Sequence, residues 1–308
     1  MQIHRHWQGI PATHRGASVA MGNFDGVHLG HQAVIDLARR PDAPLGILTF
    51  EPHPREFFAP DAPPFRLMNA EARTHRLEKL GVARLYELPF NAALARMEAE
   101  TFVTEVLVGG LGIAHVTVGA DFCFGKGRKG TVDTLRRMGA DLGFGVTIAD
   151  LVALDGTEIS STAIRTALAE GRPRDAAHML GHWHRIEGAV QHGDKRGKGL
   201  GFPTANMGVG GLHLPRLGVY AVKVDILTGP HKGTHNGAAS LGVRPMFGEN
   251  QPNLETYIFD FGGDLYGQHL SVALVDYLRP EMKFDGLDAL VAQMNADCDR
   301  ARAILEAL

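Results

Sequence analysis

The first half of the chain alternates between short apolar runs and longer segments whose apolar residues recur every three or four positions. Short apolar runs are typical of buried strands, and the longer periodic segments are typical of amphipathic helices. The predicted strands are residues 17–21, 45–50, 82–88, 115–118 and 146–149. The predicted helices are residues 29–40, 70–80, 98–107, 131–143 and 161–170. This alternation favours an α/β domain whose parallel sheet is covered on both faces.

The pattern changes near Gly181, after a short predicted helix at residues 174–180. Apolar and polar positions then alternate in runs separated by turn-forming residues, as in antiparallel strands. These predicted strands are residues 185–190, 218–226, 238–242, 254–261 and 270–277, and a helix is predicted at 287–305. We therefore expect an α/β domain at residues 1–182 and an antiparallel β-barrel with a closing helix at residues 183–308.

Composition limits the class of protein to which the chain can belong. Its 308 residues suit two domains of ordinary size, and a hydrophobic content of 44% is typical of globular proteins. The net charge of -3 argues against a broad basic face for nucleic acid. No apolar run is long enough to span a membrane, and Cys123 and Cys298 are too few for a disulfide framework. We expect a cytoplasmic protein with neither nucleic-acid nor membrane partners, whose oligomeric state the sequence leaves open.

The most informative motif is GNFDGVHLGH at residues 22–31, which follows the first predicted strand and opens a predicted helix. Such a turn directs backbone N–H groups and the positive end of a helix dipole toward an anion. The imidazoles of His28 and His31 add donors for charge that develops on a phosphoryl group. Two histidines at this spacing are commonly a surface coincidence, but their position directly after a strand favours a nucleotide-phosphate site.

Other polar clusters carry more than one interpretation. Ser160, Ser161 and Thr162 precede a predicted helix and so can cap it, or they can join Arg165 in holding pyrophosphate. The glycine-rich, basic segment 193–201 can wrap phosphates or can be a plain hairpin, and it lacks the P-loop spacing.

Three polar residues of the second half stand out. Thr204 and Asn206 lie two apart in an extended segment, so their oxygens point the same way and suit a magnesium ion. Glu255 begins a strand and is a surface carboxylate or a general base.

With these motifs in both halves, the chain resembles bifunctional prokaryotic riboflavin kinases/FAD synthetases. Similar motifs include TFEPHPREFF (49–58), VGADFCFG (118–125), LGVRP (241–245), LETYIFDF (254–261) and YLRPEMKF (277–284). The resemblance implies a Rossmann-like nucleotidyltransferase domain followed by a riboflavin kinase barrel. It further implies that the barrel phosphorylates riboflavin to FMN and that the first domain adenylylates FMN to FAD, both with ATP and Mg²⁺. A lone adenylyltransferase and a flavin-binding protein without turnover are the alternatives.

The resemblance also implies roles for particular residues. In the first domain, His28 and His31 would contact the ATP phosphates as catalytic residues. The side chain of Asp25 can cap the turn or be linked to a metal, and turn chemistry favours the capping role slightly. The nucleotide-binding residues would be Gly22, Asn23, Asp25, Gly30, Ser160, Ser161, Thr162 and Arg165. The flavin-binding residues of this domain would be Phe57, Asp121 and Phe122. Ala120 stands where the family pattern suggests an acidic residue.

In the barrel, Glu255 would be the general base for the 5′-hydroxyl of riboflavin. The residues implied to bind Mg-ATP are Gly199, Gly201, Thr204 and Asn206, with Thr204 and Asn206 as the Mg²⁺ ligands. Arg244 would border the flavin, and Met246 replaces an expected threonine.

Overall fold

The first half of the sequence does not all fold into one unit. The computed structural model describes residues 1–150, 153–154, 157–192, 201–246 and 249–308. It divides into two compact units, Met1–Ala62 with Arg73–Ile159, and Pro63–Ala72 with Ser160–Leu308. We describe each unit by itself, and we call residues 63–72, which belong to the second unit, the strap.

The first unit contains a parallel sheet of six strands in the order β1-β4-β3-β2-β5-β6. The strands are β1 Gln2–His4, β2 Ser18–Met21, β3 Leu45–Glu51, β4 Arg84–Pro89, β5 His115–Gly119 and β6 Gly145–Ala149. The predicted parallel sheet is confirmed. Sequence analysis missed β1, because it is an edge strand of three largely exposed residues and has no apolar run. A short hairpin of β7 Ala153–Leu154 and β8 Thr157–Glu158 follows.

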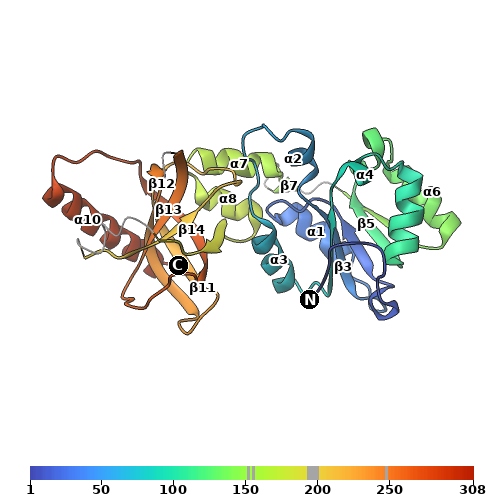
Figure 1. Cartoon of the computed structure of the whole chain (residues 1–308), viewed down its shortest axis with the longest axis horizontal. Coiled ribbons are helices and arrows are strands. Elements are labelled where there is room, and N and C mark those ends of the chain that lie inside the picture. The colour runs from blue at the N-terminus through green and yellow to red at the C-terminus, as the bar shows by residue number, and fades with distance from the viewer. Residues whose placement is uncertain (151–152, 155–156, 193–200, 247–248) are drawn as a thin grey trace. The chain divides into compact units, whose positions relative to one another are not determined.

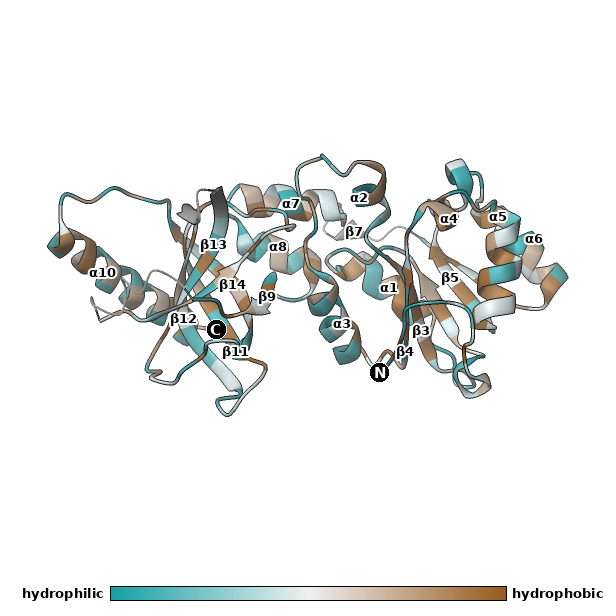
Figure 2. Cartoon of the chain, in the orientation of Figure 1, coloured by the Kyte–Doolittle hydropathy of each residue, from teal (hydrophilic) through white to brown (hydrophobic). Residues whose placement is uncertain are grey.

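Helices lie on both sides of this sheet, with α1 on one side and α6 on the other (Figure 1). The helices of this half are η1 Ala12–His14, α1 Leu29–Leu37, α2 Pro54–Phe58, α3 Ala70–Lys79, α4 Ala92–Ala95, α5 Ala99–Thr101, η2 Phe102–Leu111, η3 Lys126–Arg128 and α6 Val132–Leu142. Figure 2 shows hydrophobic residues along the strands, and the buried cluster combines strand residues such as Val19 and Val116 with helix residues such as Val106 and Leu135. The core therefore lies between the sheet and its helical layers.

The predicted helix at 98–107 is longer and wider than expected. A short α-helix, α5, continues into the π-helix η2, which ends at Leu111. Arg15 donates hydrogen bonds to the carbonyls of Val108, Gly109 and Gly110 at 2.6–3.0 Å. These contacts satisfy carbonyls that the end of a helix leaves without partners. Periodicity could not predict them, because Arg15 is far away in the sequence.

The second unit is an antiparallel barrel whose six strands follow the order β10-β13-β12-β11-β14-β9. The strands are β9 Arg185–Ala189, β10 Thr204–Gly208, β11 Gly218–Ile226, β12 Gly233–Met246, β13 Glu249–Ile258 and β14 His269–Arg279. The backbone N–H of Gln191 donates to the carbonyl of Asn206 at 2.8 Å and nearly closes the barrel between β9 and β10. The predicted barrel is confirmed.

Among the described residues, the helices that accompany the barrel are α7 Ser161–Ala169, α8 Pro173–Leu180 and α10 Leu287–Glu306. Helix α10 packs through Ala301 and Leu305 on residues of the outer barrel face such as Val219 and Val275. The predicted closing helix is thus confirmed, and its packing leaves room for a pocket nearer its N-terminal end.

The strap is held to the second unit by backbone and side-chain hydrogen bonds. The N–H of His213 donates to the carbonyl of Arg66 at 2.7 Å, and the amide of Asn69 donates to the carbonyl of Glu187 at 2.9 Å. Because these partners lie more than a hundred residues away from the strap, no local pattern in the sequence indicated its position.

Candidate active sites

The turn between β2 and α1 brings together the two histidines that the sequence singled out. His28 is the N-cap of α1, and its Nδ1 accepts a hydrogen bond from the backbone N–H of His31 at 3.3 Å. The two imidazole rings stack with their centroids 3.6 Å apart and their planes 17° apart. Both rings therefore lie at the N-terminus of a helix, at the carboxyl end of a parallel strand, where α/β sheets bind ligands.

The backbone of this turn is strained and firmly held. Phe24 and Val27 have positive φ values of 53° and 44°, which non-glycine residues rarely adopt. The side chain of Thr49 donates to the carbonyl of Asn23 at 3.2 Å, and that of Gln32 donates to the carbonyl of Val27 at 2.8 Å. Strain that neighbouring groups maintain in this way is common at ligand sites.

Asp25 and Asn23 occupy different surroundings in the turn. The side chain of Asp25 is buried, with 5% of the residue exposed, whereas Asn23 is exposed. Burial of the carboxylate within a tight turn favours the structural role that the sequence analysis preferred for it. The exposed amide of Asn23 remains accessible to a ligand.

The electrostatics of the turn favour a neutral ring at His31. Burial of His31, together with the proximity of His28, lowers the pKa of His31 well below its usual value of 6.5. Its Nδ1 is buried and has no hydrogen-bond partner among the described residues. Buried polar atoms usually have a partner, so this nitrogen is a candidate contact for a ligand.

A row of aromatic rings runs through the first unit near the carboxyl ends of β3 and β4. Phe57, Phe58 and Phe90 form a cluster with ring centroids 5.2–5.7 Å apart. Phe58 is 68% exposed, which is unusual for so large an apolar side chain. This aromatic patch is a candidate platform for a planar ligand.

The aromatic row continues from the patch to the motif that contains Phe122. Neighbouring centroids are 5.7–6.4 Å apart along the series Phe90, Phe50, Phe102, Phe124 and Phe122. Two motifs that lie more than sixty residues apart in the sequence, each with a predicted flavin-binding phenylalanine, are therefore joined by continuous ring contacts. Phe90 belongs to no predicted motif, and sequence analysis missed it.

The residues around Phe122 are largely solvated. Asp121 is exposed, and so are Arg128 and Lys129. Lys126 forms an ion pair with Glu98 at 3.0 Å. Lys126 therefore already has an acidic partner, and Arg128 and Lys129 are exposed to solvent.

Ser160 caps helix α7, since its Oγ accepts from the backbone N–H of Ala163 at 3.2 Å. Arg165, in the same helix, donates from Nε to the carbonyl of Phe65 in the strap at 2.6 Å and lies 5.3 Å from the centre of the Phe65 ring. This helix belongs to the second unit. The capping interpretation is therefore confirmed for Ser160, and Arg165 has a structural contact whatever else it does.

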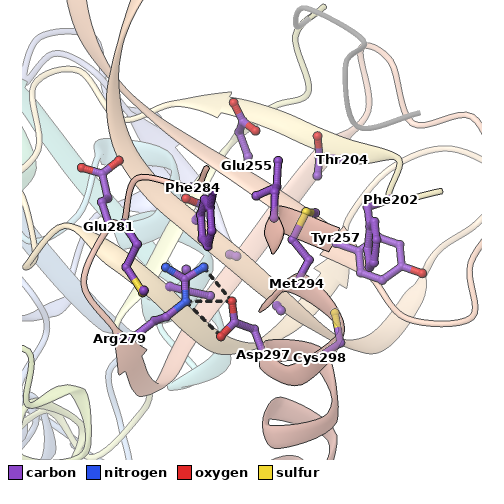
Figure 3. A pocket seen from close by; sticks show the side chains of 16 residues that line it. Phe202, Thr204, Glu255, Tyr257, Arg279, Glu281, Phe284, Met294, Asp297 and Cys298 are labelled. Carbon is purple, nitrogen blue, oxygen red and sulfur yellow. Dashed lines mark hydrogen bonds and ion pairs between the residues drawn. The ribbon is translucent and has the colours of Figure 1, made fainter. Parts of the chain in front are cut away.

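The second unit contains a pocket of about 320 Å³ between the outer face of the barrel and α10 (Figure 3). Its walls come from strands β10–β14, from the loop 280–286 and from residues 290–298 of α10. The lining residues are Phe202, Thr204, Val219, Ala238, Ala239, Ser240, Glu255, Tyr257, Arg279, Glu281, Met282, Phe284, Leu290, Met294, Asp297 and Cys298. Aromatic and thioether side chains thus form one part of the pocket and polar side chains another.

The two-residue period of the strands places the predicted kinase residues on one face. Leu254 and Ile258 point into the barrel core, so Glu255 and Tyr257 face outward into the pocket. In the strand register Asn206 lies opposite Glu255, and Ser240 lies opposite it on the other side. Glu255 is partly buried, not a fully exposed surface carboxylate.

Thr204 and Asn206 differ in their access to a ligand. Thr204 lines the pocket and is partly buried, whereas Asn206 is partly buried and is not among the residues that line it. The carbonyl oxygen of the Asn206 side chain already accepts a hydrogen bond from Asn253 at 3.0 Å. That oxygen has a second lone pair, so the pair still offers two hard oxygen donors.

Comparison with known proteins settles the family. A family model described as FAD synthetase matches residues 10–163, and one described as riboflavin kinase matches residues 180–305. A bifunctional riboflavin kinase/FMN adenylyltransferase from Pseudomonas fluorescens is 43% identical over 99% of this chain and 98% of its own length. The chain belongs to the bifunctional riboflavin kinase/FMN adenylyltransferase family.

Two further comparisons cover nearly the whole chain. The Escherichia coli (strain K12) protein of the same name is 37% identical over 93% of this chain and 92% of its own length. A crystal structure from Streptococcus pneumoniae, named a macrolide-efflux protein, has 30% identity and a TM-score of 0.81 over 97% of this chain and 98% of its own. Within the described part of this chain, no helix is long and apolar enough to cross a membrane. The predicted family and its two-part fold are confirmed.

Some predicted residues of this family member cannot be placed. Gly199 lies outside the described residues, as does the side chain of Arg244, whose backbone belongs to β12. Gly201 lies in a turn with a φ of 83°, which glycine adopts without strain. Sequence analysis did not single out Tyr257, Arg279 and Asp297, which line the pocket of the second unit.

Proposed function

We propose that the barrel of this bifunctional enzyme transfers the γ-phosphoryl group of ATP to riboflavin in the pocket beside α10. The first domain then transfers AMP from ATP to FMN at the histidine turn. The proposal assigns phosphorylation to residues 183–308 and adenylyl transfer to residues 1–182. The observation that carries it is that Glu255 and Thr204, taken from separate motifs, line the same pocket of a riboflavin kinase barrel.

In the kinase reaction, the oxygen of the riboflavin 5′-hydroxyl forms a bond to the γ-phosphorus as the bond to ADP breaks. Glu255 accepts the proton of that hydroxyl as general base. Its place in the pocket supports this role, because a carboxylate must come within hydrogen-bond reach of the hydroxyl. ADP and FMN leave as products.

Thr204 and Asn206 are the proposed Mg²⁺ ligands. A hydroxyl and a carboxamide oxygen on one strand face are hard donors of the kind that Mg²⁺ prefers, so the residues present fit the ion. When bound, Mg²⁺ would neutralise charge on the ATP phosphates. Gly199 and Gly201 are proposed to approach the same phosphates with their backbone.

The isoalloxazine ring of riboflavin is proposed to occupy the aromatic and thioether part of the pocket. Tyr257, Phe284 and Met294 supply apolar and polarisable surface of the kind that binds flat heterocycles. Arg244, in β12, is proposed to border the flavin as well.

In the adenylyl transfer, a phosphate oxygen of FMN attacks the α-phosphorus of ATP and pyrophosphate leaves. His28 and His31 are proposed to donate hydrogen bonds to the phosphates at the N-terminus of α1, where the helix dipole favours negative charge. The buried Nδ1 of His31 supports this role, because a ligand would give it a partner. The remaining nucleotide contacts are proposed for Gly22, Asn23, Asp25, Gly30, Ser160, Ser161, Thr162 and Arg165.

The flavin of FMN is proposed to lie on the aromatic patch formed by Phe57, Phe58 and Phe90, with Phe122 and Asp121 further along the row. The 68% exposure of Phe58 supports this, since an uncovered phenylalanine gains most from a planar partner. Cys123 and Cys298 are free thiols, which supports a proposed cytoplasmic location.

One assay tests both halves of the proposal. The protein is incubated with ATP and Mg²⁺ and either riboflavin or FMN, and the flavin products are separated. Glu255→Gln should lower FMN formation about a hundredfold or more and leave the FMN-to-FAD step intact, since it removes only the general base. His31→Gln should do the reverse.

A matched control is Glu281→Gln, which changes another carboxylate that lines the same pocket. We expect this variant to keep most of its FMN formation. Near-normal phosphorylation by Glu255→Gln, or equal loss of both reactions in either variant, would contradict the assignment.

A further inference from the structure

An ion pair closes one side of the kinase pocket. Its arginine lies in the motif YLRPEMKF, but sequence analysis assigned no role to either partner. Arg279 is the last residue of β14, and its Nε donates to both carboxylate oxygens of Asp297 in α10 at 3.0 and 2.9 Å. The Nη2 atom approaches Asp297 at 2.7 Å, and the amide of Gln293 donates to the same carboxylate at 2.9 Å. We call these three residues the clasp. In Figure 3 the pair lies at the opposite side of the pocket from Glu255 and Thr204.

The clasp is well shielded from water. The side chains of Arg279 and Asp297 are only 15% and 9% exposed. A multiply hydrogen-bonded arginine–carboxylate pair with little solvent is geometrically specific, and removing one partner leaves a buried charge uncompensated. The clasp therefore fixes the end of β14 against the middle of α10.

The clasp also holds the loop that joins these two elements. Arg279 donates from Nη1 to the carbonyl of Pro280 at 2.9 Å, and its guanidinium carbon lies 5.7 Å from the centre of the Phe284 ring. Glu281, Met282 and Phe284 of this loop line the pocket. One guanidinium thus contacts both the start of the loop and the aromatic ring near its end.

The opposite wall of the pocket needs no such support. It consists of the hydrogen-bonded strands β10, β12 and β13, whereas the loop has no strand partner and exposes 52% of Met282. A ligand that must order a mobile loop when it binds loses affinity, because ordering the loop costs conformational entropy. A loop that is already fixed before binding avoids this cost.

We propose that the clasp positions residues 280–286 as a preformed wall of the pocket and thereby sets its affinity for riboflavin. The inference rests on the proposed placement of riboflavin in this pocket. Arg279 and Asp297 act here as positioning residues, because their effect on the substrate passes through the loop.

The test uses the full-length protein and the kinase assay at saturating ATP and Mg²⁺. Asp297→Asn should raise the KM for riboflavin about tenfold and change kcat by less than about threefold, because binding and not proton transfer is affected. Arg279→Lys should act in the same direction, since an ammonium cannot reproduce the fork of contacts. The double variant should be no worse than the poorer single one, as expected for one shared interaction.

The matched control is Asp260→Asn, which removes a second arginine–aspartate pair made by α10. Arg302 donates to both Asp260 oxygens at 2.8 and 3.0 Å, but that carboxylate is 78% exposed and does not line the pocket. We expect this variant to keep the wild-type KM. Conversion of supplied FMN to FAD, measured on each variant, checks that the first domain is intact.

A further variant, Met294→Phe, separates the clasp proposal from the proposed placement of riboflavin in this pocket. Met294→Phe narrows the pocket without touching the clasp and should raise the KM if riboflavin binds there. If it does so while Asp297→Asn and Arg279→Lys both leave the KM within about twofold of wild type, the clasp proposal is overturned and the pocket assignment stands. If Met294→Phe also has no effect, both are overturned. Should Asp297→Asn fail to fold, Arg279→Lys, which keeps the positive charge, decides alone.

Discussion

His184 couples the stability of the second unit to pH. It lies just before β9 with 3% of its surface exposed, and its Nε2 has no hydrogen-bond partner among the described residues. Burial, together with the nearby His182 and His213, lowers the pKa of His184 to about 3. The native state therefore keeps this ring neutral near pH 7.

The sign and size of the effect follow from that pKa. In the unfolded chain a histidine takes up a proton below about pH 6.5, whereas the native His184 does not. The unfolded state therefore binds more protons than the native state. As the pH falls, the unfolded state is stabilised and the free energy of unfolding decreases. The contribution is fully present above pH 6.5 and is lost progressively toward the native pKa. Between about pH 7.5 and about pH 5.5 the free energy of unfolding should fall by about 1.4 kcal/mol because of this group alone.

The two tryptophans, Trp7 and Trp183, allow the second unit to be followed separately. In a Trp7→Phe background, fluorescence comes from Trp183, which packs in the cluster beneath α10. Urea unfolding is measured at both pH values with His184 and with His184→Gln, which has no titratable group. The drop in free energy should be about 1.4 kcal/mol larger in the protein that keeps His184. The same pH dependence in both proteins would refute the reasoning.

Three further changes test other parts of the structure. Gly218→Ala should destabilise the second unit by about 2 kcal/mol or more in the same urea assay. Gly218 has a φ of +145°, and a Cβ there would lie 2.2 Å from the carbonyl oxygen of Arg279. An unchanged urea midpoint would show that the backbone of β14 shifts at little cost to make room for the methyl group. Asn69→Ala should cost that unit about 1–2 kcal/mol by removing the helix cap and the bond to Glu187, and a change confined to the first unit would argue against the strap. Phe58→Ser should raise the KM for FMN in FAD formation about tenfold without altering riboflavin phosphorylation, whereas an unchanged KM would remove the aromatic patch from the flavin site.

Much of the fold followed from local patterns. The alternation of apolar runs and helical periods predicted the parallel sheet, and the two-residue period predicted the barrel, because both reflect which side chains each element buries. The same period explains why Thr204 and Glu255 were found to line one pocket. Strand β10 was described only as extended, since four of its five residues are polar or small and give no apolar run.

What sequence analysis missed depends on partners that are distant along the chain. Arg279 and Asp297 lie in different elements, and each by itself is an ordinary charged residue near a strand end or on a helix. Phe90 gains meaning only through ring contacts with Phe57 and Phe50. The placement of the strap depends likewise on the N–H of His213 and the carbonyl of Glu187, which come late in the sequence. Periodicity within one segment cannot predict such pairings.

The strap has a consequence for any attempt to divide the protein. Because residues 63–72 belong to the second unit and their neighbours on both sides belong to the first, the chain crosses between units three times, at 62/63, 72/73 and 159/160. A protease that cuts only between Ile159 and Ser160 would produce the fragments 1–159 and 160–308. These fragments would stay associated, because the strap in the first fragment is hydrogen-bonded to the second. Conversely, a gene truncated to encode the barrel alone would yield a kinase that lacks a segment supplied in the native chain by the other half.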